Sequence, residues 1–111
     1  MIKVKALLDY ALALDEQNPY KIALLFSDVC YFSDGALRPL GCSDMIAKTS
    51  DELAKIFIAL FRKAQISVKI IQMFPHSMSY TVRINGEEFF CIGCATLDDK
   101  GKIKEYIIRT L

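Results

Sequence analysis

The feature that most constrains this chain is a change of hydrophobic period near Gln65. Before it, apolar side chains recur every three to four residues, the spacing of amphipathic helices. After it, apolar and polar residues alternate, as they do in strands with one buried face. The clearest alternation sets Met78, Tyr80, Val82 and Ile84 against Ser79, Thr81, Arg83 and Asn85. Because 111 residues suit one domain, we expect a single α+β domain over residues 1–111, with the helices before the main sheet.

Three helices are predicted in the first part of the chain. The first spans residues 3–15, and its apolar stripe runs beside Tyr10. The second starts at Asn18-Pro19 and ends near residue 26, with proline in an early position. The third runs from 50 to about 64, with Ser50 as the predicted N-cap and acidic residues in its first turn.

The strands are predicted mainly in the second half of the chain. A short strand is expected over 28–33, followed by a turn at Asp34-Gly35 and a loop over 36–43. Four further strands are expected over 66–74, 78–84, 89–97 and 103–110. Asn85-Gly86 is a strong hairpin signal, and residues 98–101 form a second turn. The four strands are therefore expected to form an antiparallel meander.

Both faces of the last two predicted strands are apolar. In the strand over 89–97, the alternation predicts two opposite faces: one carries Phe89, Cys91, Gly93 and Ala95, and the other carries Phe90, Ile92 and Cys94. In the last strand it places Ile103 and Ile107 on one face and Tyr106 and Ile108 on the other. Helices cover one face of such a sheet, so the other face would be left open to water. A large exposed apolar face implies a partner, and we expect a homodimer through the outer sheet face.

Composition excludes several classes of function. Fourteen basic and thirteen acidic residues give a net charge of +1, which argues against nucleic-acid and membrane-surface partners. Charged residues interrupt the start of the chain and make it a poor signal peptide, so a cytoplasmic protein with reduced thiols is expected.

Cys91 and Cys94 have C-x-x-C spacing but should face opposite sides of a strand. With His76 the single histidine, no metal site and no cofactor is predicted.

Three segments resemble a known family. They are residues 25–34, which run from a helix end into a strand closing on an aspartate; Gly41 with the helix that follows, beginning at 51; and residues 97–106, a turn with the final strand. Together they are similar to the nuclear transport factor 2-like (NTF2-like) superfamily, in particular its ketosteroid isomerase and SnoaL-like polyketide cyclase branches. The resemblance implies a cone-shaped α+β fold in which three N-terminal helices pack on a curved, mostly antiparallel sheet of four to six strands, with an apolar pocket inside.

The resemblance also implies a catalytic site. Ketosteroid isomerase uses an aspartate base and an oxyanion hole made by a tyrosine and a protonated aspartic acid. Asp34 falls at the position of the base and Tyr10 at that of the tyrosine. Gly93 falls at the position of the protonated acid and has no donor to offer. The expected substrate-binding residues, which would form the pocket wall, are Phe57, Phe61, Met73, Met78, Tyr80 and Gly93.

Each of these residues has a simpler alternative. Asp34 is either a general base or an aspartate that bonds its own turn. Tyr10 and the pocket residues suit a plain core equally well, and His76 and Arg38 are surface residues by default. The functions that remain are a proton-transfer isomerase or cyclase acting on a small apolar carbonyl compound, a non-catalytic protein that binds a hydrophobic ligand, and a protein-interaction module.

Overall fold

The computed structural model describes residues 5–110 and confirms the α+β class. Its helices are α1 (Lys5–Asp15), α2 (Pro19–Leu24) and α3 (Ser50–Lys63), and a short 3₁₀ helix spans Arg38–Leu40. Its strands are β1 (Phe26–Asp34), β2 (Met45–Thr49), β3 (Ile66–Met73), β4 (Ser77–Ile84), β5 (Glu87–Leu97) and β6 (Ile103–Thr110). The predicted start of the first helix at residue 3 lies outside the described residues.

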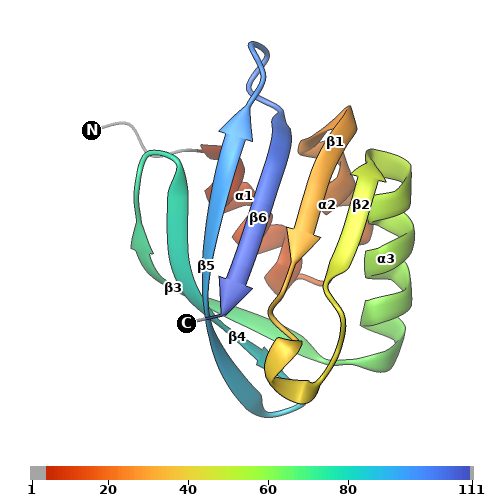
Figure 1. The fold of residues 1–111 in the computed structure, drawn as a ribbon, viewed down its shortest axis with the longest axis vertical. Coiled ribbons are helices and arrows are strands. Elements are labelled where there is room, and N and C mark those ends of the chain that lie inside the picture. Colours follow the sequence, from red (N-terminus) through yellow and green to blue (C-terminus); the bar gives the residue numbers. More distant parts are fainter. Residues whose placement is uncertain (1–4, 111) are drawn as a thin grey trace.

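The six strands form one mixed sheet in the order β2-β1-β6-β5-β4-β3 (Figure 1). Strands β3 to β6 are the predicted antiparallel meander. Asn85 and Gly86 join β4 to β5 with φ angles of 50° and 89°, the positive values that a type I′ hairpin turn requires. Strand β1 pairs in parallel with β6, and β2 pairs antiparallel with β1.

Strand β2 was missed by the sequence prediction. Its five residues include one fully buried side chain, Ala47, so they show no clear alternation. The strand exists because β1 offers it an edge, with Ala47 opposite Phe32 and Met45 opposite Asp34. Pairing with a distant segment, rather than local pattern, therefore determines β2.

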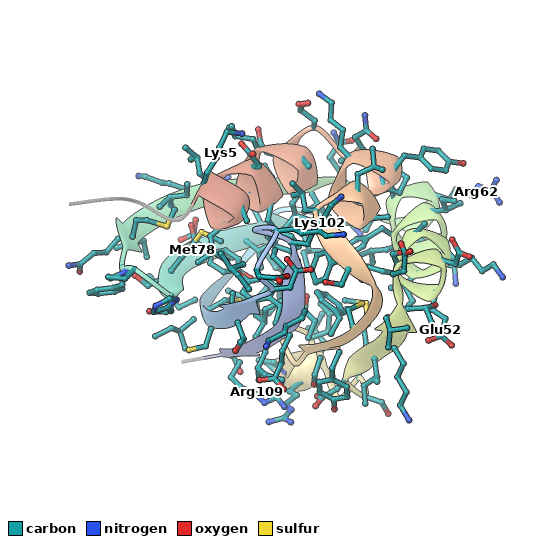
Figure 2. All side chains as sticks on the ribbon, turned by 90° about the horizontal axis from the view of Figure 1, so that it is seen from above. Lys5, Glu52, Arg62, Met78, Lys102 and Arg109 are labelled. Carbon is teal, nitrogen blue, oxygen red and sulfur yellow. The ribbon has the colours of Figure 1, made fainter. Side chains whose placement is uncertain are left out.

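The helices lie together against the sheet. Helix α1 contacts β3, α3 contacts β1 and β2, and α2 contacts both other helices. Figure 2 shows side chains filling the space between the helices, where Lys5 lies, and the sheet, with Arg109 on the far side. Within residues 5–110, no helix combines the length and hydropathy needed to cross a membrane.

Aromatic rings occupy the centre of this core. Tyr10 and Tyr106 meet edge to face with their ring centroids 4.9 Å apart. Phe26, Phe32 and Phe57 continue the chain of edge-to-face contacts, at 5.9 Å and 5.7 Å. Such contacts favour defined ring orientations as well as burial, so the core is expected to hold its aromatic side chains in fixed positions.

The predicted alternation in β5 is confirmed. Cys91 is fully buried and Cys94 is exposed, so the two sulfurs do face opposite sides of the sheet. In β6 the prediction for Ile103 was wrong, because Ile103 is buried on the same side as Tyr106. The pairing shifts where Leu97 lies opposite Ile103, and this irregularity changes which face the residue occupies.

The N-cap of α3 is also different from the prediction. Thr49, not Ser50, has the extended backbone of an N-cap, and its Oγ1 accepts a hydrogen bond from the backbone N–H of Glu52 at 3.1 Å. The Glu52 side chain accepts a hydrogen bond from the N–H of Lys48 at 2.7 Å. Thr49 therefore both ends β2 and begins α3.

We expect Thr49→Ala to lower the free energy of unfolding by about 1 kcal/mol, because it removes the side-chain cap of α3. Ser50→Ala is the matched control and should change it by a few tenths at most, since the first residue inside a helix has no capping bond to lose. Urea unfolding measures both variants. Equal losses, or a larger loss for Ser50→Ala, would contradict the assignment.

Candidate functional site

Asp34 ends β1 in the interior of the molecule. It lies opposite Met45 in β2 and Ile108 in β6, and it is 8% exposed. Its Oδ1 accepts a hydrogen bond from the backbone N–H of Ala36 at 2.8 Å, so the residue does bond its own turn. The described residues provide no hydrogen bond for Oδ2. One carboxylate oxygen thus shapes the turn, and the other is left for a ligand or a proton.

A cavity of about 20 Å³ adjoins Asp34. The residues that line it are apolar apart from Asp34 and Tyr80. They come from α1, α3, the strands β1 to β4 and the loop after Asp34, and include Leu14, Leu37, Phe57, Leu60, Ile66 and Val82. This volume is enough for one water molecule. In this closed form, the cavity is therefore smaller than the carbonyl compounds that the sequence analysis considered.

Only some of the predicted pocket residues line the cavity. Phe57 and Tyr80 line the cavity beside Asp34. Met78 is fully buried but belongs to the core away from the cavity wall, whereas Phe61 and Met73 are half-buried at its periphery. Phe61 packs on Phe57, with ring centroids 5.4 Å apart, so it supports a wall residue without lining the cavity.

Burial raises the pKa of Asp34 to about 6. The Ala36 N–H and the Arg109 guanidinium act against this rise, and the Asp44 carboxylate adds to it. Arg38, taken above as a surface residue by default, makes a bidentate ion pair with Asp44, at 2.6 Å and 2.7 Å. A carboxyl group with a pKa of about 6 exchanges its proton close to neutral pH.

Tyr10 is fully buried on α1, and its hydroxyl has no hydrogen-bond partner among the described residues. Burial raises its pKa well above 10, and the Asp34 carboxylate raises it further. Burial and the Asp34 carboxylate also raise the pKa of Tyr80 and Tyr106, and the nearby Tyr80 hydroxyl offsets part of the rise at Tyr106. Each of these three buried phenols therefore keeps its proton at neutral pH. Tyr80 lines the cavity beside Asp34, whereas Tyr10 and Tyr106 lie in the core and do not line it.

Sequence reasoning missed Tyr106. A Cβ atom on Gly93 would lie against the Tyr106 hydroxyl and within 2.6 Å of two of its ring carbons, so no side chain fits at position 93. The signal was a glycine inside a strand, which commonly marks a close approach of another group. Gly93 therefore does not leave an empty place, because a phenol from the neighbouring strand fills it.

The remaining candidates lie elsewhere. His76 is in the exposed turn between β3 and β4 and does not line the Asp34 cavity. Its backbone carbonyl accepts a hydrogen bond from Ala95 at 2.8 Å. Across residues 5–110, no three His, Cys, Asp or Glu side chains gather as a metal site would require.

The raised pKa of Asp34 predicts a pH dependence of stability. The folded state holds this proton up to about pH 6, whereas the unfolded state releases it near pH 3.8, so folding is weakened as pH rises between these values. The loss is on the order of 3 kcal/mol for a shift of about two pH units. We expect the free energy of unfolding of Asp34→Asn, measured with urea, to show no such fall between pH 4 and pH 6. Asp99→Asn, in an exposed turn, should keep it. The same fall in both variants would contradict the assignment.

Sequence comparisons find no relative: no family model matches the chain, and no curated protein matches it. Solved structures do match. A ketosteroid isomerase candidate from Kribbella flavida is 9% identical with a TM-score of 0.75, over 96% of this chain and 76% of that chain. An NTF2-like protein of unknown function from Cytophaga hutchinsonii is 16% identical with a TM-score of 0.74, over 100% and 92%.

An epoxide hydrolase from Mycobacterium tuberculosis, described as LEH-like, is 15% identical with a TM-score of 0.72, over 97% of this chain and 81% of that chain. At these identities the likeness concerns the fold. The order of helices and strands, the mixed six-stranded sheet and the structural matches agree on one architecture. The chain has the fold of the NTF2-like superfamily, as its resemblance to that superfamily implies.

Proposed function

We propose that this protein binds a small apolar carbonyl compound beside Asp34 and moves a proton on it, as an isomerase or cyclase does. The observation that carries the proposal is a buried carboxylate, with a pKa of about 6, on the wall of an apolar cavity that Tyr80 also lines. The hydroxyls of Tyr10 and Tyr106 have no partner among the described residues, and the Asp34 carboxylate raises the pKa of both, although neither residue lines the cavity. Fold neighbours that include a ketosteroid isomerase candidate and an epoxide hydrolase are consistent with a site at this place.

The proposed reaction assigns a role to each group. Asp34 takes a proton from the carbon next to the carbonyl group, and the electrons of that C–H bond move to the carbonyl oxygen. The Tyr10 hydroxyl donates a hydrogen bond to this oxygen, where negative charge develops. The protonated Asp34 then returns the proton to a different carbon, which completes an isomerisation and restores the carboxylate. The apolar wall excludes water during these steps.

The closed cavity must widen for a ligand to enter, because about 20 Å³ holds one water molecule. The loop between β1 and β2 provides the movable wall, since Ala36 and Leu37 line the cavity and the loop has no strand partner. The Arg38–Asp44 ion pair joins the two sides of this loop at the surface. Ligand entry is thus proposed to displace residues 35–44 while the sheet and α3 stay in place.

Isomerisation of β,γ-unsaturated cyclic ketones tests the proposal, because the conjugated product is followed by ultraviolet absorbance. We expect kcat/KM to rise with pH and level off above an apparent pKa of about 6, where Asp34 is ionised. Asp34→Asn should reduce the rate by about 10²- to 10⁴-fold, the usual contribution of a general base. Asp99→Asn, remote from the site, should leave it unchanged.

A second outcome separates the alternative function. If Asp34→Asn binds the ketones as tightly as the unmodified protein and neither shows turnover, the site is a non-catalytic pocket for a hydrophobic ligand. If neither protein binds these ketones, the small-ligand proposal is wrong. The third function considered, a protein-interaction module, would then be left, and the outer sheet face is the surface that favours it.

We also propose a homodimer through the outer sheet face. This surface, the outer-face patch, is formed by side chains from four strands: Val29, Tyr31, Ile46, Phe90, Ile92 and Ile107. Val29 is 78% exposed and Phe90 52% exposed, unusually open for residues within a sheet. An apolar surface of this kind on one face of a sheet normally meets a partner, and a second copy of the chain supplies the same apolar surface.

We expect sedimentation at micromolar concentration to give about twice the 12.6 kDa of one chain. Ile92→Lys and Ile107→Lys should each shift the protein to monomer, because a lysine buried in a dry interface has no counter-charge. Leu24→Lys is the matched control, since Leu24 is 68% exposed on α2 and lies outside the patch. Circular dichroism confirms that each variant is folded. A monomeric unmodified protein would contradict the proposal.

A further inference from the structure

Two buried hydroxyls near Asp34 lack partners. Tyr10 and Tyr106 are both 0% exposed, and neither hydroxyl oxygen has a hydrogen-bond partner among the described residues. Buried polar groups in proteins are nearly always hydrogen-bonded, so each exception calls for an explanation. Here the two exceptions are neighbours, because their rings meet edge to face at 4.9 Å. Neither residue lines the cavity beside Asp34, so an acceptor for both hydroxyls would have to enter between these two side chains.

We propose that Tyr106 is the second hydrogen-bond donor of the site, so that the Tyr10 and Tyr106 hydroxyls together bind one oxygen atom of the carbonyl ligand. This inference rests on the proposed function. It replaces the expectation that Tyr10 would be the single side-chain donor. The acceptor is a carbonyl oxygen in the bound ligand, and it becomes an oxyanion when Asp34 removes a proton.

Gly93 makes this arrangement possible. The Tyr106 hydroxyl lies where a side chain of residue 93 would begin, which is the position that the resemblance gives to a protonated acid. The second hydrogen-bond donor would therefore come from β6 instead of the adjacent strand β5, and Gly93 leaves the space that the Tyr106 hydroxyl occupies. Across the strand pair, Tyr106 lies opposite Ala95 and Ile108 lies opposite Gly93, so the phenol reaches along the sheet over small residues.

The surroundings hold the two donors in place. Tyr106 also packs against Phe32, with ring centroids 6.4 Å apart, and Tyr10 packs edge to face on Phe26 at 6.3 Å. Tyr10 belongs to α1 and Tyr106 to β6, so the acceptor would be held between a helix and the sheet. Donors fixed in advance in an apolar core stabilise developing charge without reorganisation. Burial and the Asp34 carboxylate raise the pKa of both hydroxyls, so both keep the proton that they donate.

The competing explanation is a structural partner for these hydroxyls: a buried water that satisfies both, or, for Tyr106, the nearby Tyr80 hydroxyl, which lowers the pKa of Tyr106. The two explanations differ in what Tyr106→Phe changes. If the hydroxyl binds a ligand oxygen, its removal weakens ligand binding and leaves the unligated fold as stable as before, or more stable, because an unpartnered polar group is lost. If it binds a structural water, its removal lowers stability and leaves ligand affinity unchanged.

The experiment uses substituted phenols, including 4-nitrophenol, because a phenolate oxygen imitates an enolate oxyanion. We expect the bound 4-nitrophenol to ionise at lower pH than the free compound, which its visible absorbance reports. Tyr106→Phe should weaken phenolate binding about tenfold or more, the usual effect of losing a hydrogen bond to a charged group. It should also reverse part of the shift in ionisation, and affinity should depend less steeply on the acidity of the phenol. A purely structural role would move neither of the last two readouts.

Tyr10→Phe should show the same loss, whereas Tyr20→Phe is the control and should match the unmodified protein, because Tyr20 is 65% exposed on α2 and lies outside both the site and the outer-face patch. The double change Tyr106→Ala with Gly93→Asp tests the position itself, because it removes the phenol and supplies a carboxylic acid in the vacated space. We expect it to bind phenolates more tightly than Tyr106→Ala alone. Urea unfolding of every variant confirms that it folds.

The outcomes separate this inference from the function on which it rests. If Tyr10→Phe loses phenolate affinity and Tyr106→Phe does not, Tyr106 is not a donor and the inference is wrong, while the proposed function stands. Loss of stability in Tyr106→Phe with unchanged affinity also overturns it, in favour of the structural water. If the unmodified protein binds no phenol and isomerises no ketone, both proposals fall.

Discussion

The parallel pairing of β1 with β6 is the contact on which the rest of this structure depends. It joins the helical first part of the chain to the meander, and it aligns Asp34 with Ile108 and Phe32 with Tyr106. Backbone hydrogen bonds extend it at both ends, from the Gly35 N–H to Ile108 and from the Ile103 N–H to Leu25. Without this register, the carboxylate at the end of β1 and the phenol of β6 would not share a neighbourhood.

The same pairing brings polar side chains with few or no hydrogen-bond partners into the core. A carboxylate with a raised pKa and two phenols without partners all reduce the stability of a fold that must exclude water around them. Such groups persist where the surrounding structure holds them firmly, and here the aromatic contacts around Tyr106 and Phe32 do so. Residues at functional sites commonly lower the stability of the fold in this way. The cluster of Asp34, Tyr10 and Tyr106 is therefore a better candidate for function than the larger, open surface groove between α1 and the turn that joins β5 to β6.

Much of the fold could be predicted from local pattern, and the errors have physical causes. The helices and the four meander strands follow from hydrophobic period, and the Asn85-Gly86 turn from its backbone demands. Strand β2 was missed because its partner β1 determines it. Ile103 was assigned to the wrong face because an irregular pairing near Leu97 reverses the alternation. For the site, the sequence predicted Asp34 at the end of its strand and offered a bond to its own turn as one of two alternatives, and the structure shows that bond to the Ala36 N–H. The extent of its burial, 8% exposed, comes from the structure alone.

The sequence by itself determined the α+β class, the antiparallel meander, the opposed faces of β5 and the presence of an aspartate where β1 ends. These depend on periodicity and on turn residues, which act between neighbours in the chain. Only the tertiary structure decided that Tyr106 fills the space over Gly93, that Thr49 caps α3, and that the pKa of Asp34 rises to about 6. Each of these depends on the distance between groups and on the exclusion of water from them. Neither can be derived from the order of residues alone, because both arise only when strands distant in sequence are brought into register.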